Sequence, residues 1–130
     1  MTWTITIPYL VPSQNVRERQ HWRVQRRDIA TVAIMLRGHG AKIPKATGRR
    51  LVTITSYRRQ RIRDSANLVG GCKGLNDAMV RAELLVDDCD RWATFTYRQH
   101  VLSEMPPELA RKYGRRPVTV IEIEDVSPAG

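Results

Sequence analysis

Residues 61–90 read RIRDSANLVGGCKGLNDAMVRAELLVDDCD and combine a helical repeat with a series of acidic side chains. Side chains that recur every three or four residues share one side of a helix. An apolar stripe with this spacing comprises Leu68, Cys72, Leu75 and Met79. A second, more polar face half a turn away comprises Ala66, Gly70, Lys73 and Asp77. The stretch therefore predicts an amphipathic helix that packs its apolar stripe on a sheet.

The start and the glycines of this predicted helix carry further information. Asp64 or Ser65 is expected to cap the helix, because a short side-chain oxygen at that place accepts a hydrogen bond from the first turn. Gly70, Gly71 and Gly74 each weaken a helix by roughly 1 kcal/mol relative to alanine, so their presence needs another explanation. Two explanations stay open: close approach of a nucleic-acid backbone, and close packing of the helix against a strand.

The segments on either side predict a mixed α/β fold. Alternating or β-branched residues indicate strands at residues 2–7, 51–57, 92–99 and 117–124. A first helix is expected at residues 17–36, with an apolar side that comprises Trp22, Ile29, Val32 and Leu36. Turn residues predict loops at residues 8–15 and 106–114. The expected architecture is a single domain, residues 1–130, in which a small mixed sheet of about four strands packs with two main helices.

The charge balance favours a polyanionic partner. The 130 residues are 42% hydrophobic, and 22 Lys and Arg against 13 Asp and Glu give a net charge of +9. Arginine dominates, and it binds phosphate oxygens through paired hydrogen bonds. The residues expected to bind DNA are Arg58, Arg59, Arg61, Arg63, Arg111, Lys112, Arg115 and Arg116. Two further basic clusters are Arg23-Arg26-Arg27 and Arg49-Arg50. The alternatives are a solvated basic surface without a partner and, for residues 111–116, a mobile surface loop.

Cysteines and histidines limit the other chemistries. Cys72 and Cys89 are the two cysteines, and the sequence has neither a signal-peptide apolar region nor a long apolar run, so we expect a cytoplasmic protein with no membrane partner. His21, His39 and His100 are scattered, and no cysteine has a neighbour at zinc-ligand spacing. The sequence therefore favours neither a zinc site nor nucleophilic covalent catalysis.

Residues 61–90 resemble the RusA family of Holliday-junction resolvases, small phage and prophage enzymes that cut four-way DNA junctions using magnesium. The family pattern is Asp-x-Asp-Asn-Leu, a lysine, Asp-Ala with a large apolar residue, and a pair of aspartates before a strand. The matching residues are Asp64-Ser65-Ala66-Asn67-Leu68, Lys73, Asp77-Ala78-Met79 and Asp87-Asp88. Residues 4–8, with Pro12, Ser13 and Asn15, resemble the opening strand and polar loop of the family more weakly.

The resemblance implies hydrolysis of a phosphodiester by metal-activated water. Asp64 and Asp88 are the expected ligands of Mg²⁺, with Mn²⁺ as a substitute; Asp87 would share the ion or support the ligands. Lys73 would stabilise charge that develops on the phosphate. No organic cofactor is implied. A homodimer is expected, because a four-way junction presents two symmetric strands for cutting and a two-fold dimer places one site on each.

Two positions depart from the family pattern. Lys73 lies seven residues beyond position 66 instead of four, and both spacings return the lysine to nearly the same helix face. Ala66 stands where the family has a metal-binding aspartate, and a methyl group does not coordinate a cation. Either the chain is impaired or another acid substitutes. Three functions thus stay open: a junction-resolving endonuclease, an inactive junction-binding protein, and a general DNA- or RNA-binding module.

Overall fold

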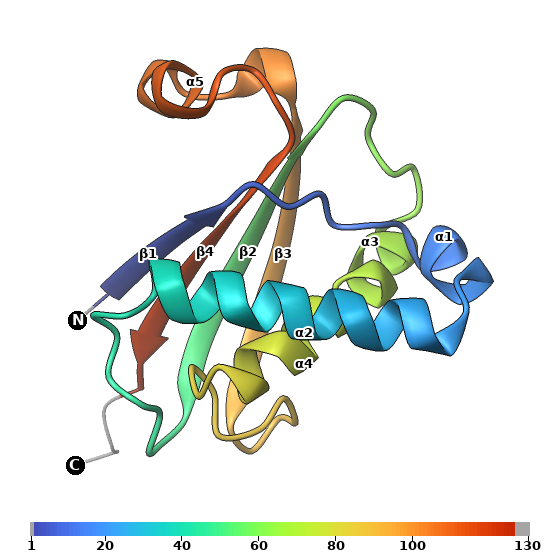
Figure 1. The fold of residues 1–130 in the computed structure, drawn as a ribbon. Helices are drawn as coiled ribbons and strands as arrows, with labels where there is room; N and C mark the ends of the chain where they lie inside the picture. The colour runs from blue at the N-terminus through green and yellow to red at the C-terminus, as the bar shows by residue number, and fades with distance from the viewer. Residues whose placement is uncertain (1, 127–130) are drawn as a thin grey trace.

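The computed structural model describes residues 2–126 and confirms a small α/β domain (Figure 1). The strands are β1 (Thr2–Ile7), β2 (Arg50–Arg58), β3 (Ala93–Val101) and β4 (Val118–Asp125). The helices are α1 (Gln14–Arg19), α2 (Trp22–His39), α3 (Ser65–Gly71), α4 (Lys73–Arg81) and α5 (Pro107–Tyr113), with a 3-10 turn at Leu102–Glu104. All four strands fall at the predicted places, and their bounds differ from the predicted ones by at most two residues.

The four strands form one mixed sheet in the order β1-β4-β2-β3. β2 and β3 are parallel, with Arg50 opposite Ala93, whereas β4 is antiparallel to both β1 and β2. Parallel neighbours require a crossover connection, and here α3 and α4 supply it. The motif stretch is therefore the crossover of a β-α-β unit.

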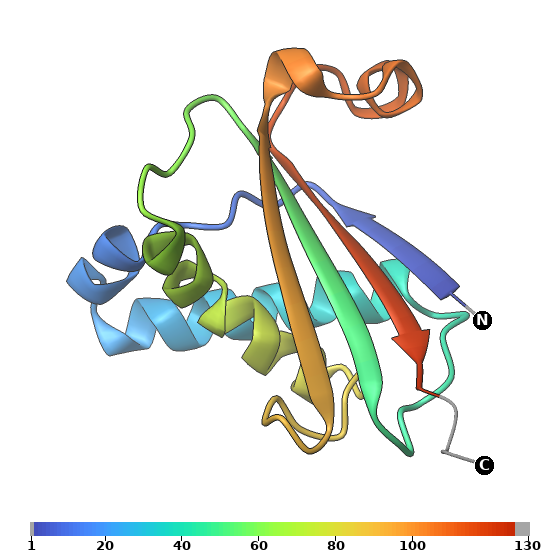
Figure 2. The ribbon, with the colours of Figure 1, turned by 180° about the vertical axis from the view of Figure 1, so that it is seen from behind.

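Helices α1 to α4 lie on one face of the sheet (Figures 1 and 2). The opposite face, which is turned to the viewer in Figure 2, is not covered by any helix of residues 2–126. The core lies between the helices and the sheet, and its sheet side includes Ile5, Ile7, Val52, Ile54, Ile121 and Ile123. The predicted apolar stripe of Leu68, Cys72, Leu75 and Met79 is buried in this core, as expected. Burial of these side chains is what holds the crossover on the sheet.

The predicted helix at residues 17–36 is in fact two helices. Ser13 caps α1 by accepting a hydrogen bond from Val16 N, and α1 ends before Gln20. His21 Nδ1 then accepts a hydrogen bond from Arg23 N at 3.1 Å, which starts α2 in a new direction. Trp22 was expected on the apolar side and lies in solvent instead, 54% exposed. That prediction was wrong because Trp22 lies in the first turn of α2, whereas the buried residues of this helix, Val32, Ala33 and Leu36, all lie in its second half.

Two further predictions need correction. The expected continuous helix after Asp64 is divided at Cys72 into α3 and α4, where the glycine-rich segment tightens the turn. The predicted loop at residues 106–114 contains α5, because Pro107 occupies the first helical position and Gly114, with a φ of 69°, ends the helix. Within residues 2–126, no helix has both the length and the apolar composition needed to cross a bilayer.

Arg50 belongs to the core instead of the basic surface on which the sequence placed it. Its side chain is 2% exposed. Nε lies 2.8 Å from Asp125 Oδ1, while the two terminal nitrogens donate to Leu84 O and Pro44 O at 2.9 Å each. The guanidinium also lies 5.1 Å from the centre of the Trp3 ring. Arg50 thus ties β2, β4 and the loops at their ends together.

We expect Arg50→Met to lower the free energy of unfolding by about 3 kcal/mol, since it leaves the buried Leu84 carbonyl and the partly buried Pro44 carbonyl without their donor. The melting temperature should fall by roughly 10 °C, read by circular dichroism. Arg49→Met is the matched control, because Arg49 is exposed and its loss should change stability by no more than about 0.5 kcal/mol. Equal melting temperatures for the two variants would contradict the structural role of Arg50.

Candidate metal and nucleic-acid site

The crossover begins with Asp64, at the end of the loop that follows β2. Asp64 caps α3: its Oδ1 accepts a hydrogen bond from Ala66 N at 2.9 Å, and its carbonyl oxygen accepts from Asn67 N at 3.0 Å. The side chain is exposed, and its second carboxylate oxygen makes no hydrogen bond with any residue in the described range 2–126. Asp64 is thus the helix cap that the sequence predicts, with one oxygen left for another ligand.

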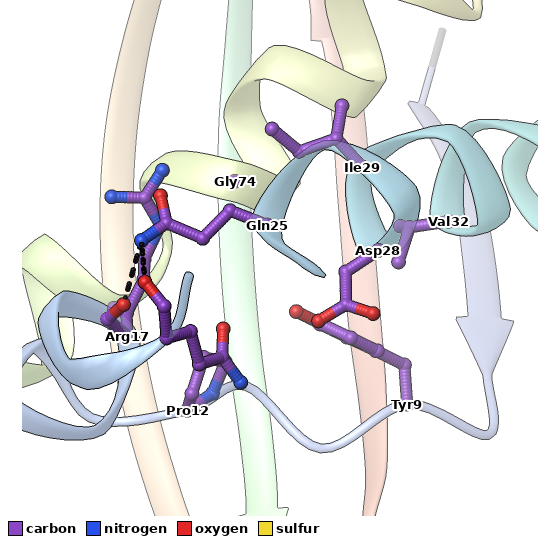
Figure 3. A pocket seen from close by; sticks show the side chains of 10 residues that line it. Tyr9, Pro12, Arg17, Gln25, Asp28, Ile29, Val32 and Gly74 are labelled. Carbon is purple, nitrogen blue, oxygen red and sulfur yellow. Dashed lines mark hydrogen bonds between the residues drawn. The ribbon is translucent and has the colours of Figure 1, made fainter. Parts of the chain in front are cut away.

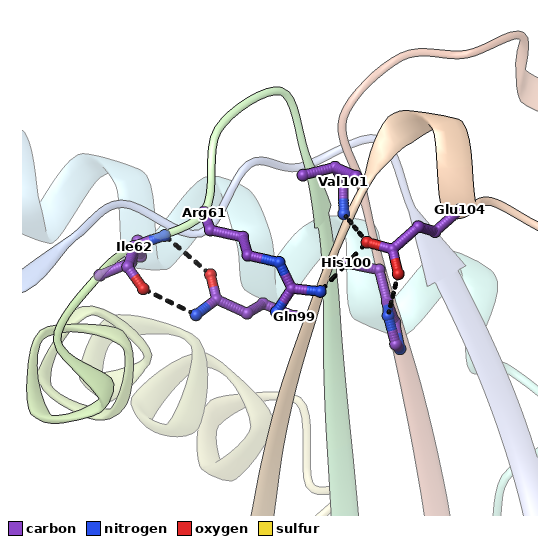
Figure 4. Close-up of polar contacts among 6 residues, drawn as sticks. All are labelled: Arg61, Ile62, Gln99, His100, Val101 and Glu104. Atoms are coloured by element: carbon purple, nitrogen blue, oxygen red, sulfur yellow. Dashed lines mark hydrogen bonds and ion pairs between the residues drawn. The ribbon is translucent and has the colours of Figure 1, made fainter.

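The loop that carries Asp64 is fixed to β3. Gln99 binds both sides of one peptide, since its Oε1 accepts from Ile62 N and its Nε2 donates to Ile62 O, each at 2.8 Å (Figure 4). Arg61, next in the loop, pairs with Glu104 at 3.1 Å. Glu104 Oε2 also lies 3.6 Å from His100 Nδ1 (Figure 4). These contacts hold the loop in one conformation and so define where Asp64 stands.

Ala66 and Lys73 both present exposed side chains, one in the first turn of α3 and the other at the start of α4. Gly70 lies between them along the crossover, and the side chain of Gln14 covers it. The polar face predicted from the sequence is therefore interrupted by α1. Position 66 nevertheless has room for a longer side chain in solvent.

Two of the glycines are explained by close packing of the crossover against the N-terminal segment. A Cβ at Gly71 would lie 1.7 Å from the carbonyl oxygen of Pro12, and one at Gly70 would lie 2.5 Å from Gln14 Oε1. The contact with the Pro12 backbone excludes any side chain at Gly71. A side chain at Gly70 would fit only if the Gln14 side chain moved away. Of the two explanations left open by the sequence, packing is the one observed, but the partner is the Pro12–Gln14 segment instead of a strand.

Three carboxylates gather between α4 and the loop that follows it: Asp77 belongs to the helix, and Asp87 and Asp88 belong to the loop. Asp87 Oδ1 accepts a hydrogen bond from Asp88 N at 2.7 Å. Burial raises the pKa of the Asp88 carboxyl, and hydrogen bonding to Asp87 and the negative charge of Asp77 raise it further. Asp77 is half-buried and is not one of the α4 residues that form the core. It is absent from the metal ligands predicted from sequence, although its helical phase with Lys73 was a signal for it.

The structure does not bring Asp64 into this group. Asp64 stands before α3, whereas Asp87 and Asp88 follow α4, at the other end of the crossover. Across residues 2–126, no three His, Cys, Asp or Glu side chains are close enough together to hold a metal ion as they stand. Of the predicted metal ligands, only Asp87 and Asp88 are therefore neighbours.

The chemistry of the carboxylate group suits a hard divalent cation. Mg²⁺ prefers carboxylate oxygens and keeps several waters, so it needs only one or two protein carboxylates. Burial is the main cause of the raised pKa of Asp88, and Asp87 and Asp77 add to it; a cation between these groups would offset their negative charge. Asp77, Asp87 and Asp88 fit such an ion by the type of their oxygens.

A partly buried polar pair, Asn76 and Tyr97, lies beside the acidic group and was not predicted from the sequence. Asn76 Nδ2 donates to the hydroxyl oxygen of Tyr97 at 2.9 Å, while Asn76 Oδ1 is buried with no hydrogen-bond partner among the described residues. Burial raises the pKa of Tyr97, and the negative charge of Asp88 acts in the same direction. The pair links α4 to β3 next to the acidic loop. No local pattern marks it, because the two residues meet only through the tertiary fold.

The predicted DNA-binding residues divide into two groups. Arg58, Arg61 and Arg115 are engaged within the chain: Arg58 donates to Val11 O at 2.7 Å, Arg61 pairs with Glu104, and Arg115 donates to Leu102 O at 2.9 Å. The exposed members without a hydrogen bond or ion pair in the described part of the chain are Arg59, Arg63, Arg111, Lys112 and Arg116. Arg111 and Lys112 lie in the last turn of α5, so they are presented by a helix and not by a mobile loop.

Neither a scan against protein-family models nor a search of curated proteins finds a match for this chain.

Proposed function

We propose that this chain is a magnesium-dependent, structure-selective endonuclease that resolves four-way DNA junctions, impaired by Ala66 in place of a metal-binding aspartate. The observation that carries the proposal is the motif order, found on the crossover of a β-α-β unit in a chain with a net charge of +9. The exposed Asp64 and Lys73, and the gathered Asp87 and Asp88, are the motif members that support it. It acts, on this proposal, in the cytoplasm of a bacterial or phage host.

In the proposed reaction, the carboxylates bind metal and the lysine stabilises charge on the phosphate. Asp87 and Asp88, together with Asp77, would hold Mg²⁺ or Mn²⁺. Asp64 is the other ligand that the family motif implies, but it lies apart from this group, with one free oxygen at the start of α3. When bound, the metal lowers the pKa of a coordinated water and so supplies the nucleophile. Lys73 would stand beside the scissile phosphate and stabilise the negative charge that grows on it. An aspartate at position 66 would complete the carboxylate set next to Asp64.

A homodimer belongs to the proposal, because resolution requires paired cuts in two strands of the same junction. Two basic surfaces related by a two-fold axis engage junction arms that a linear duplex does not present together. On this basis, competitor duplex should leave a junction complex largely intact. A monomer that binds duplex and junction equally would favour the general nucleic-acid-binding module instead.

Salt dependence tests which arginines meet phosphate. We expect Arg63→Gln to flatten the plot of log affinity against log salt by roughly 0.9 for a duplex-armed junction, since one released counterion is lost. Arg61→Gln should flatten it less, because Glu104 already neutralises that guanidinium at 3.1 Å. Fluorescence anisotropy between about 50 and 200 mM salt gives both slopes. Identical slopes for both variants and the parent chain would remove the loop after β2 from the DNA interface.

The second candidate function is a junction-binding protein without nuclease activity. Ala66 favours it, since the residue occupies an exposed first-turn position and offers no oxygen. A titration of Mg²⁺ separates the two functions: junction binding without cleavage at any Mg²⁺ concentration supports the second, and cleavage that rises with Mg²⁺ supports the first.

A further inference from the structure

Trp22 is an exposed aromatic residue at a corner of the fold. It begins α2 and is 54% exposed, whereas Trp3 and Trp92 are both partly buried. The guanidinium carbons of Arg23 and Arg26 lie 5.3 and 5.4 Å from the centre of the Trp22 ring. An aromatic ring thus stands in solvent with two cations beside it.

Packing does not explain the position of Trp22. The side of α2 that faces the sheet is formed farther along the helix, where Val32, Ala33 and Leu36 are buried. Trp22 adds nothing to that core. A single exposed apolar side chain is common on protein surfaces, so what distinguishes Trp22 is the pair of guanidinium groups beside its ring.

The charges around Trp22 indicate which ligand would cover it. An apolar protein surface would bury Arg23 and Arg26 without acidic partners, which is unfavourable. A nucleotide combines a flat π-face for the ring with a phosphate for the guanidinium groups. In a duplex the faces of the bases are stacked on one another, so an accessible base must be unpaired. The arrangement therefore fits a single-stranded or flipped-out nucleotide.

The corner that holds Trp22 is attached to the proposed site. Gln25 Nε2 donates to Arg17 O at 2.8 Å and to Gln20 O at 3.1 Å, which fixes the turn between α1 and α2 (Figure 3). The Arg17 side chain in turn crosses Gly74, one residue after Lys73, at 3.6 Å from where a Cβ would stand. In Figures 1 and 2, α1, α3 and the first turn of α2 lie at the same end of the domain. Arg17 thus links the first turns of α2, which begins with Trp22, to the start of α4, which begins with Lys73.

We propose that Trp22, with Arg23 and Arg26, is a stacking site for an unpaired nucleobase of the bound nucleic acid. The inference rests on nucleic-acid binding from the proposed function but not on cleavage. At a junction, such a site would hold a base released where the arms meet, and it would add selectivity for branched over linear DNA.

Binding of three labelled probes in EDTA tests the stacking site: a thymidine 12-mer, the same 12-mer with abasic sites throughout, and a 12-base-pair duplex. We expect Trp22→Ala to weaken binding of the thymidine strand about tenfold, within the range for one base stacked on an aromatic ring. Trp22→Phe should retain most of that affinity, because a ring remains. Affinity for the abasic strand and for the duplex should be unchanged in both variants.

Val24→Ala is the matched control, since Val24 is also an exposed apolar residue of α2, 38% exposed, and its truncation should change none of the affinities. A second measurement uses the variant with Trp3→Phe and Trp92→Phe, whose remaining tryptophan fluorescence should be quenched by the thymidine strand and not by the abasic one. Equal weakening of all three probes by Trp22→Ala, or no weakening, would overturn the proposal. Since EDTA removes metal, failure of junction cleavage leaves this result valid, whereas absence of binding to every probe would overturn both.

Discussion

Ala66→Asp is expected to raise Mg²⁺-dependent cleavage of a four-way junction by at least about a hundredfold, because it restores a carboxylate that acts on the chemical step. The backbone nitrogen of residue 66 already donates to Asp64 Oδ1 at 2.9 Å, so a side chain at 66 starts next to the Asp64 carboxylate. The position is exposed and lies in the first helical turn, where an acidic residue is also favourable to the helix. Single-turnover cleavage of a labelled junction measures the rate.

The control is Ser65→Asp, which places the same charge on the neighbouring exposed residue of the same turn. Ala66→Asn adds a side chain of the same shape without the charge. Both should cleave no faster than the parent chain, and all three variants should bind the junction with similar affinity. An Ala66→Asp rate equal to that of the parent would refute the assignment of position 66 as a lost metal ligand.

Asp88→Asn should abolish the cleavage gained by Ala66→Asp while leaving junction affinity the same or higher. It removes a proposed ligand and also a negative charge from a surface that meets phosphate. Stability should not fall, since burial and the acidic neighbours Asp87 and Asp77 both raise the pKa of Asp88 and so disfavour its charged form. Asp64→Asn should have the same effect on cleavage, and Lys73→Ala should slow the reaction with less effect on metal binding. The measurements are single-turnover cleavage and junction anisotropy on each variant.

Asp90→Asn is the control for Asp88→Asn, because Asp90 is exposed and lies two residues away outside the gathered group. Asp90→Asn, made in the Ala66→Asp protein, should leave the rate of junction cleavage unchanged. Asp77→Asn tests a residue that was not among the metal ligands predicted from sequence, since the neighbourhood of Asp77 and Asp88 predicts a loss of cleavage. Full activity of Asp88→Asn would mean that the carboxylate assignment is incorrect.

Local periodicity was sufficient to predict the strands and the buried stripe of the crossover. β-branched alternation marks β1 and β2, and the three-to-four spacing of the stripe Leu68, Cys72, Leu75 and Met79 follows from burial against a sheet. Both signals come from residues close in sequence. The periodicity of a helix or strand indicates which of its sides faces the core, and the structure buries that same side.

Contacts between distant residues account for what the sequence did not predict. The break before Trp22 depends on the cap at His21, and the glycine at position 71 depends on Pro12, more than fifty residues earlier in the chain. The sequence places Arg50 in a basic surface cluster, because its partners Leu84 and Asp125 are distant along the chain and meet it only in the folded structure. Asp77 likewise joins the acidic group only because the loop after α4 folds back toward that helix.

The most direct test of the central claim is the cutting pattern of the Ala66→Asp protein on a four-way junction in Mg²⁺, with the same sequences as linear duplexes in parallel. Each strand is end-labelled in turn. The proposed function predicts paired nicks at symmetric positions in two opposite strands, none in the linear duplexes, and none when EDTA replaces Mg²⁺. Absence of nicks from the junction in Mg²⁺, or equal cutting of junction and duplex, would contradict a junction-resolving nuclease.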